Sequence, residues 1–366
     1  MRQSVGWALV AGCGALLSVA VAAQEFSRAE QPLDPVEPPQ TLEETGLYSD
    51  FSAGEIDPAH LFFAPQYPLW TDGAVKRRWI SLPESGVIDA SDPDAWVFPI
   101  GTRFWKEFAF GGRPVETRFM ELQPSGKWLF AVYEWSLDGQ EARLAPVRGR
   151  GNAFPLAGGR FHVIPSVSDC GVCHKSRSTE VLGFSALQLS PDRDLEALHA
   201  EPTLLKAVDL DYLIDHHLIV GLSASFREDS PRIAARSPVE RAALGYLHGN
   251  CGHCHNATSK LSDLDLVLSG SVSSLEQAVL TTTVDQPFHE PPPGLSPEAF
   301  LRIAPGQPDR SGLLQRMASR SPALQMPPLG TALVDEEAVA LLREWISELP
   351  EKNDKTTKAT TEEENE

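Results

Sequence analysis

Residues 169–174 read Asp-Cys-Gly-Val-Cys-His (DCGVCH), and residues 250–255 read Asn-Cys-Gly-His-Cys-His (NCGHCH). Both stretches contain Cys-x-x-Cys-His, and together they use four of the five cysteines in the chain. This pattern is the attachment sequence of c-type haem: two sulfurs reach the vinyl groups on one porphyrin edge, and the histidine coordinates the iron. The repeat therefore predicts two covalently attached haems, bound through Cys170, Cys173, Cys251 and Cys254 and ligated by His174 and His255.

Two other chemistries use paired cysteines. A four-thiolate zinc site usually separates its two pairs by about 15–20 residues, whereas residues 174–250 lie between Cys173 and Cys251. A thioredoxin-like redox site uses one pair in a β-α-β setting, which neither pair has. Each pair is also followed by its own histidine, so the spacing favours haem over zinc or disulfide exchange.

The first 23 residues have the composition of an export signal. Arg2 precedes a small and apolar run, Val5 to Ala23, which ends in Val-Ala-Ala. This order is typical of a cleaved signal peptide, so we expect residues 1–23 to be removed and the mature protein to be periplasmic. The alternatives are an uncleaved membrane anchor and a lipid on Cys13, which ends a lipobox-like Leu-Val-Ala-Gly-Cys. No other stretch is apolar enough to span a membrane.

The charge of the chain limits its partners. Its 366 residues carry a formal net charge of -19. Nucleic acid is therefore excluded as a partner, because its phosphates would be repelled. An acidic surface instead favours basic patches on a partner protein.

Residues 237–350 show two amphipathic helical patterns on either side of the second motif. One begins at the capping box Ser237-Pro238-Val239-Glu240, and the other runs from Asp335 to Leu349. The Met-Pro-Pro-Leu-Gly stretch at 326–330 lies between them. These features resemble a class I cytochrome c domain. The resemblance implies an all-α domain with crossing first and last helices, and Met326 as the sixth iron ligand opposite His255.

The rest of the chain predicts an α+β multidomain protein. Residues 24–45 are rich in Pro and Glu and indicate a disordered linker. Residues 46–168 contain short aromatic-rich stretches separated by Gly and Pro, which predict an antiparallel β-sandwich-like domain. We expect residues 169–236 to be a helical segment around the first haem, and the polar residues 351–366 to be a disordered acidic tail.

Several stretches outside the motifs also resemble a family of uncharacterised bacterial periplasmic dihaem proteins. They are Tyr67–Ala74, Val97–Thr102, Ile164–Ser166, Leu182–Leu189 and Ala243–His248. The resemblance covers about residues 46–349 and implies a β domain joined to two haem sites. It implies no particular reaction.

The sixth ligand of the first haem is not determined by the sequence. No Met-Pro-Pro stretch follows Cys173. The candidates are His199 and Met120, which are narrowly favoured, and His162, His216 and His217. An open sixth position is the remaining possibility, and it would allow the iron to bind peroxide or another small ligand.

These patterns favour an electron-transfer protein over an enzyme, and we expect no catalytic residues. It would pass electrons from a periplasmic dehydrogenase or carrier to an oxidase or another cytochrome. The alternative is a peroxidase-like dihaem oxidoreductase with an open first haem. Dihaem peroxidases place their first motif near the mature N-terminus, whereas here about 146 residues precede it (24–169). A third possibility is that the β domain binds a ligand or partner through surface tryptophans such as Trp96, Trp105 and Trp128.

Overall fold

The computed structural model describes residues 36–201, 207–272, 277–288 and 300–351. The expected signal peptide, Cys13, most of the expected linker and nearly all of the acidic tail lie outside these residues. The described residues from Pro38 onward form one compact unit.

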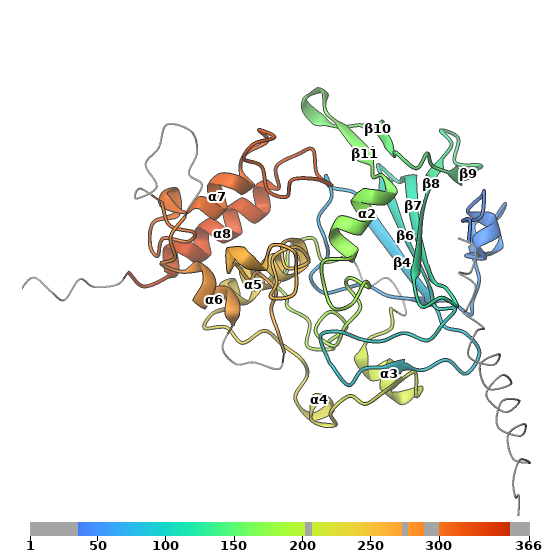
Figure 1. Ribbon diagram of the computed structural model, residues 1–366, viewed down its shortest axis with the longest axis horizontal. Helices are drawn as coiled ribbons and strands as arrows, with labels where there is room; N and C mark the ends of the chain where they lie inside the picture. The colour runs from blue at the N-terminus through green and yellow to red at the C-terminus, as the bar shows by residue number, and fades with distance from the viewer. Residues whose placement is uncertain (1–35, 202–206, 273–276, 289–299, 352–366) are drawn as a thin grey trace, which may run out of the picture. The chain divides into compact units, whose positions relative to one another are not determined.

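A six-stranded antiparallel sheet is the largest element of this unit (Figure 1). The long strands at its centre are buried or half-buried along almost their whole length, as expected of a sheet that is covered on both faces. The strand order is β3-β4-β6-β7-β8-β9. The strands are β3 (Leu61–Phe62), β4 (Val75–Ser81), β6 (Arg103–Phe110), β7 (Arg113–Leu122), β8 (Trp128–Trp135) and β9 (Ala142–Leu144).

Three small strand pairs flank the sheet. They are β1 (Tyr48–Asp50) with β2 (Glu55–Ile56), β10 (Arg150–Pro155) with β11 (Phe161–Ile164), and β5 (Ile88–Asp89) parallel to β12 (Ile219–Val220). Short helices make up the remaining regular structure. They are α2 (Val167–His174), α3 (Leu210–Asp215), α4 (Ser225–Glu228), α5 (Pro238–Asn250), α6 (Ala278–Thr283), α7 (Gly312–Met317) and α8 (Glu336–Glu348), with 3-10 turns η1 (Glu43–Thr45), η2 (Ala157–Gly159), η3 (Ser262–Leu264) and η5 (Pro308–Arg310).

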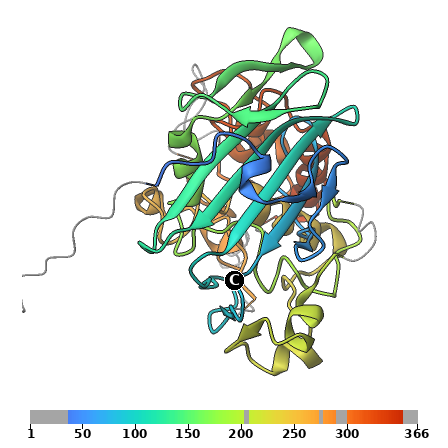
Figure 2. The ribbon, with the colours of Figure 1, turned by 90° about the vertical axis from the view of Figure 1, so that its right-hand side faces the viewer.

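One face of the sheet is covered by the N-terminal segment of the unit, which crosses the strands in Figure 2. Leu42 and Leu47 are fully buried there against Trp79, Trp105 and Tyr133. The backbone N–H of Leu42 also donates to the Ala142 carbonyl, 2.9 Å away. Residues 38–45, which we expected to be the end of a linker, therefore lie against the sheet.

The opposite face of the sheet packs against α2 and the loops that follow it. Phe104, Met120 and Phe130 are adjacent on neighbouring strands, and Phe104 contacts Phe184 from the loop after α2.

Trp96 and Trp105 are almost completely buried, and Trp128 is partly buried against the same core as Phe104. These tryptophans are core residues. They therefore do not form an exposed surface that could bind a ligand or partner.

Helices α5 and α8 form where the two amphipathic patterns predict them, and they pack against each other. The Trp345 indole donates to Glu240 across their contact at 3.1 Å. Their core is not self-contained, however, because it includes Tyr67 and Leu187, which precede the predicted cytochrome c domain at residues 237–350.

The predicted fold class is therefore wrong. The described residues contain one six-stranded sheet with short helices rather than a β-sandwich-like domain followed by a helical one. No all-α cytochrome c domain is evident in this part of the chain. The physical reason is that long loops connect the helices and that α5 buries its apolar face partly against Tyr67, so both halves share one core.

The contact between α5 and Tyr67 depends on glycine. A Cβ atom at Gly245 would overlap the Tyr67 ring, and one at Gly249 would overlap the Tyr67 backbone carbonyl. The absence of a side chain at these positions lets the helix lie directly on the segment 67–70.

We expect Gly249→Ala to destabilise the protein. Overpacking against a backbone atom costs about 1–3 kcal/mol, and the better helix propensity of alanine offsets about 1 kcal/mol of it. Denaturant unfolding should show a lower midpoint. Gly151→Ala is the matched control, because no atom lies within 4 Å of a Cβ built at Gly151. Equal midpoints for the two variants would contradict the close approach.

Candidate functional site

The first motif forms helix α2. Ser166 is its N-cap: its hydroxyl accepts from the Asp169 N–H at 3.1 Å, and the Asp169 carboxylate accepts from the Ser166 N–H at 2.9 Å. This reciprocal capping box fixes the start of the helix. Cys170, Cys173 and His174 then occupy its last two turns, above strand β8.

His174 has the geometry of a neutral imidazole ligand. Its Nδ1–H donates to the Glu180 carbonyl at 2.6 Å, which leaves Nε2 without the proton. Burial lowers the pKa of His174 to about 4, and the positive charges of Lys106 and Arg118 contribute to the same shift. Its ring lies 5.1 Å from that of Phe130 on β8. The side chain is thus uncharged at neutral pH and held in one orientation.

A cavity of about 380 Å³ lies beside this motif, and Cys170, Cys173 and His174 line it. Its size falls within the range of pockets that hold cofactors. Much of its wall is apolar or aromatic, including Trp70 and Phe130. Two sulfurs, a neutral imidazole and an apolar wall are the surroundings that a c-type haem requires. The residues around the first motif therefore fit this group.

The second motif begins where α5 ends. The Asn250 side chain accepts from the Trp70 N–H at 2.7 Å and donates to the Pro68 carbonyl at 3.3 Å. Cys251 follows as the C-cap of the helix. The docking of α5 on residues 67–70 thus fixes the position of the second motif relative to the sheet.

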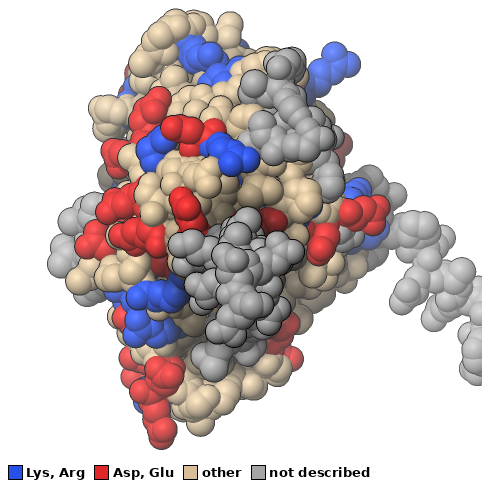
Figure 3. Space-filling view, turned by 90° about the vertical axis from the view of Figure 1, so that its left-hand side faces the viewer, with Lys and Arg blue, Asp and Glu red and all other residues tan. Residues whose placement is uncertain are grey.

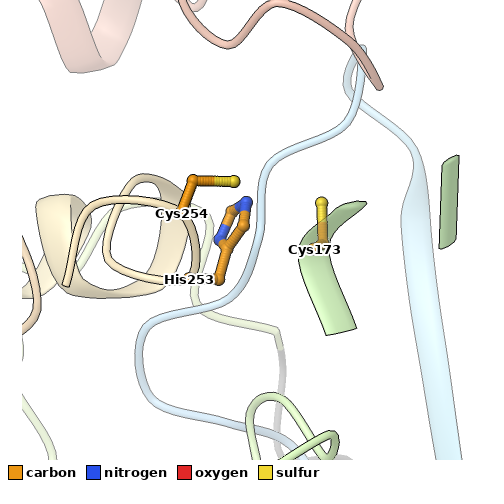
Figure 4. A group of neighbouring side chains, drawn as sticks. All are labelled: Cys173, His253 and Cys254. Atoms are coloured by element: carbon orange, nitrogen blue, oxygen red, sulfur yellow. The ribbon is translucent and has the colours of Figure 1, made fainter. Parts of the chain in front are cut away.

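The two motifs meet. Cys173 of the first motif lies beside His253 and Cys254 of the second, as Figure 4 shows, and their ligand atoms all lie within 4.8 Å of one another. A hydrogen bond from the Asn256 amide to the Ser176 carbonyl, 3.0 Å long, joins the segments that follow the motifs. Residues 80 positions apart in the chain therefore form one site.

The other residues predicted to hold the second haem do not share one large cavity. Cys251 and Met326 line the same small cavity, whose volume is about 20 Å³. His255 is not among the residues that line it, and its buried Nδ1 has no hydrogen-bond partner among the described residues. Burial lowers the pKa of His255 to about 4, with the nearby charge of His253 the next largest cause. The donor atoms suit a haem, whereas a cavity of this size holds about one water molecule.

Of the five candidates for the sixth ligand of the first haem, only Met120 lines the cavity beside His174. Both ring nitrogens of His162 contact carboxylates, and His199 Nε2 lies 2.8 Å from Asp335. His216 and His217 are exposed at the end of α3. Met120 is therefore the candidate that the structure places beside the first motif, and the four histidines lie elsewhere.

Sequence reasoning missed two groups in this cavity. His248 and His253 line it, and so do three cations on adjacent strands of the sheet, Arg78, Lys106 and Arg118. The signal for the cations was present in the stretches Lys-Arg-Arg-Trp, Trp-Lys-Glu-Phe and Glu-Thr-Arg-Phe. Strand alternation directs these cations to one face, but only the pairing register shows that they are neighbours.

A buried histidine connects the sheet to the cavity wall. His162 lies between Asp72 (Nδ1 to Oδ2, 3.4 Å) and Glu116 (Nε2 to Oε1, 3.1 Å). Asp72 in turn accepts from the backbone N–H groups of Ala332 and Leu333. Burial alone would lower the pKa of His162, but the hydrogen bonds to Asp72 and Glu116 outweigh it and raise the pKa. A protonated His162 donates to both carboxylates at once.

No family model, curated protein or solved structure matches this chain. Among the described residues, none of the helices combines the length and apolarity needed to cross a membrane.

We expect the stabilising contribution of His162 to fall as pH rises past neutrality. Because the folded-state pKa of His162 is raised, its contribution is fully present below about pH 6.5, the usual histidine pKa, and is lost as pH rises through the raised value. Free energies of unfolding of the wild type and of His162→Gln at pH 6 and pH 8.5 measure this loss, and the advantage of the wild type should be larger at pH 6. The exposed control His217→Gln should show no such change relative to the wild type. An advantage over His162→Gln that is equal or larger at pH 8.5 would refute the interaction.

Proposed function

We propose that this protein is a periplasmic dihaem c-type cytochrome. It would transfer electrons from a periplasmic dehydrogenase or carrier to a downstream acceptor. Two Cys-x-x-Cys-His motifs, neutral His174, and a cavity that fits the first haem support this assignment. Haem iron supplies one-electron chemistry when it is bound.

The observation that carries the proposal is the contact between the two motifs. Cys173 and Cys254 lie within 4.8 Å of each other. If both haems are attached, a thioether bond would join each of these sulfurs directly to the edge of a porphyrin. Two groups held at neighbouring sulfurs would then have adjacent edges, which is the arrangement that transfer between two redox centres needs.

The protein's own residues have distinct tasks in this proposal. Glu180 fixes the His174 tautomer through its carbonyl, which orients the imidazole toward the cavity. The apolar cavity wall limits the access of water. Met326 would provide a thioether ligand for the second haem, and ligation by histidine and methionine raises a reduction potential relative to ligation by two histidines. The first haem would then be the entry point and the second the higher-potential centre.

The second candidate is a peroxidase-like dihaem oxidoreductase. The cavity beside His174 is the observation that favours it, since it leaves room for a small ligand once Met120 is not bound to iron. The two candidates differ in one property, the coordination of the first iron.

The acidic surface is suited to a basic redox partner. Figure 3 shows several groups of acidic side chains on the face at the end of the molecule that carries α7 and α8. Glu336, Glu337, Glu344 and Glu348 of α8 are exposed. Complementary charge increases the rate of encounter between proteins.

We expect two covalent haems per chain when the protein is made with the c-haem maturation machinery. Haem content and optical spectra, oxidised and reduced, measure this on one sample. A Cys170→Ala/Cys173→Ala double variant should retain one haem, and so should Cys251→Ala/Cys254→Ala. Bound zinc with no haem would contradict the proposal, because Cys173, His253 and Cys254 then serve as metal ligands.

The spectra of a matched pair of variants separate the two candidates. Met120→Ala should convert the first haem from a six-coordinate low-spin form to a high-spin form if Met120 is its ligand, which supports electron transfer. The control is Met317→Ala, a buried methionine near the second motif. A first haem that is high-spin in the wild type and turns over peroxide faster than free haem would favour the enzyme.

A further inference from the structure

The sheet presents a row of cations to the first-haem cavity. Arg78 pairs with Lys106 across β4 and β6, and Lys106 pairs with Arg118 across β6 and β7. All three residues line the cavity together with Cys170, Cys173 and His174. Neighbouring strands lie about 4.8 Å apart, so the row extends over roughly 10 Å. It runs from the side of β8, which contacts α2, toward β4.

The charges of this row are not balanced within the described residues. Lys76, two residues before Arg78 on β4, adds a fourth cation; Lys76 and Arg78 are buried, and Lys106 and Arg118 are half-buried. Two carboxylates are bonded to these four cations: Glu201 to Arg78, and Glu116 to Arg118. Glu116 also contacts His162, whose other partner is Asp72. When Lys76 and Lys106 are both protonated, as an anion beside them would favour, the row has more positive than negative charge.

Lys106 is at the centre of this imbalance. It forms no hydrogen bond or ion pair among the described residues, and its ammonium lies 4.9 Å from the Phe108 ring. The Arg118 guanidinium lies 4.2 Å from the same ring, and its buried Nε lacks a partner in the described part of the chain. Burial and the charges of Arg78, Lys76 and Arg118 lower the pKa of Lys106 well below its usual value. A partly buried cluster of like charges is costly without an anion.

We propose that Arg78, Lys106 and Arg118 form an anion-binding floor that holds a carboxylate or small oxyanion against the first haem. The inference rests on the proposed function, since it needs a haem at Cys170 and Cys173. Such a haem brings two propionates of its own, on the edge opposite the attached vinyl groups, and these are one source of the anion. A free inorganic oxyanion in the cavity is the other source.

The test uses the haem-loaded full chain and the charge of Lys106. Lys106→Met removes the cation, and Lys106→Arg retains it. The matched control is Lys127→Met, which removes an exposed lysine at the turn between β7 and β8. If Lys106→Met does not attach haem, Lys106→Gln is measured in its place. The readouts are the reduction potential of the first haem between pH 5 and 8, and optical titration of the oxidised protein with nitrite.

Propionates as the anion predict one set of results. Lys106→Met should reduce the equilibrium constant for reduction of the first haem about tenfold, or ~59 mV for one electron. Its potential should also become more dependent on pH, because a propionate without its cation titrates nearer neutrality. Lys106→Arg and Lys127→Met should behave as the wild type.

A free oxyanion predicts a different set. Nitrite should then give a saturable spectral change in the wild type, and Lys106→Met should weaken its binding at least tenfold. The anion-binding floor is refuted if two haems attach and Lys106→Met matches Lys127→Met in potential, pH profile and nitrite titration. A wild type without a haem at the first motif instead refutes the proposed function.

Discussion

The close approach of α5 to the segment 67–70 determines how the two motifs are arranged. Gly245 and Gly249 let the helix contact Tyr67 without an intervening side chain, and Asn250 closes the contact through Trp70 and Pro68. The second motif follows directly, so its position depends on this packing. Because the first motif is fixed on the sheet by α2, the same contact brings Cys254 beside Cys173.

Buried charge is the second constraint on this protein. A cavity wall that combines apolar side chains with several cations is expensive to form in water-free surroundings. The aromatic ring of Phe108 offsets part of this cost, since Lys106 and Arg118 both lie over it. His162, held between Asp72 and Glu116, joins the sheet to the segment that contains Ala332 of the cavity wall. The same residues therefore determine both the charge of the cavity and its shape.

Local patterns predicted α5 and α8 because periodic apolar residues and end caps are encoded within each segment. The long strands of the sheet followed from their aromatic-rich alternation in the same way. The predicted fold class failed because Tyr67, more than 170 residues before α5, packs with α5 and α8, and no local pattern records such a contact. The cation row was missed for the same reason: Arg78, Lys106 and Arg118 become neighbours only through strand register.

In the candidate site, too, the features encoded locally were predicted and the contacts between distant residues were not. Spacing within each motif identified the cysteines and histidines as a set, and the structure places Cys170, Cys173 and His174 around one cavity. The preference for His199 as a sixth ligand had only its position after the motif to support it. Its ring instead contacts Asp335 at the start of α8. Met120 reaches the cavity because strand alternation turns it to the same face as Phe104 and Phe130.

Two haems attached to this chain would have adjacent edges. Spectroelectrochemical titration of both haems, compared with each single-haem cysteine variant, tests it most directly. Adjacent centres interact through their charges, so reduction of one should lower the potential of the other by the same amount in either order. The account predicts that each haem titrates at a different potential in the dihaem protein than it does alone. Two haems whose potentials are identical alone and together would contradict it.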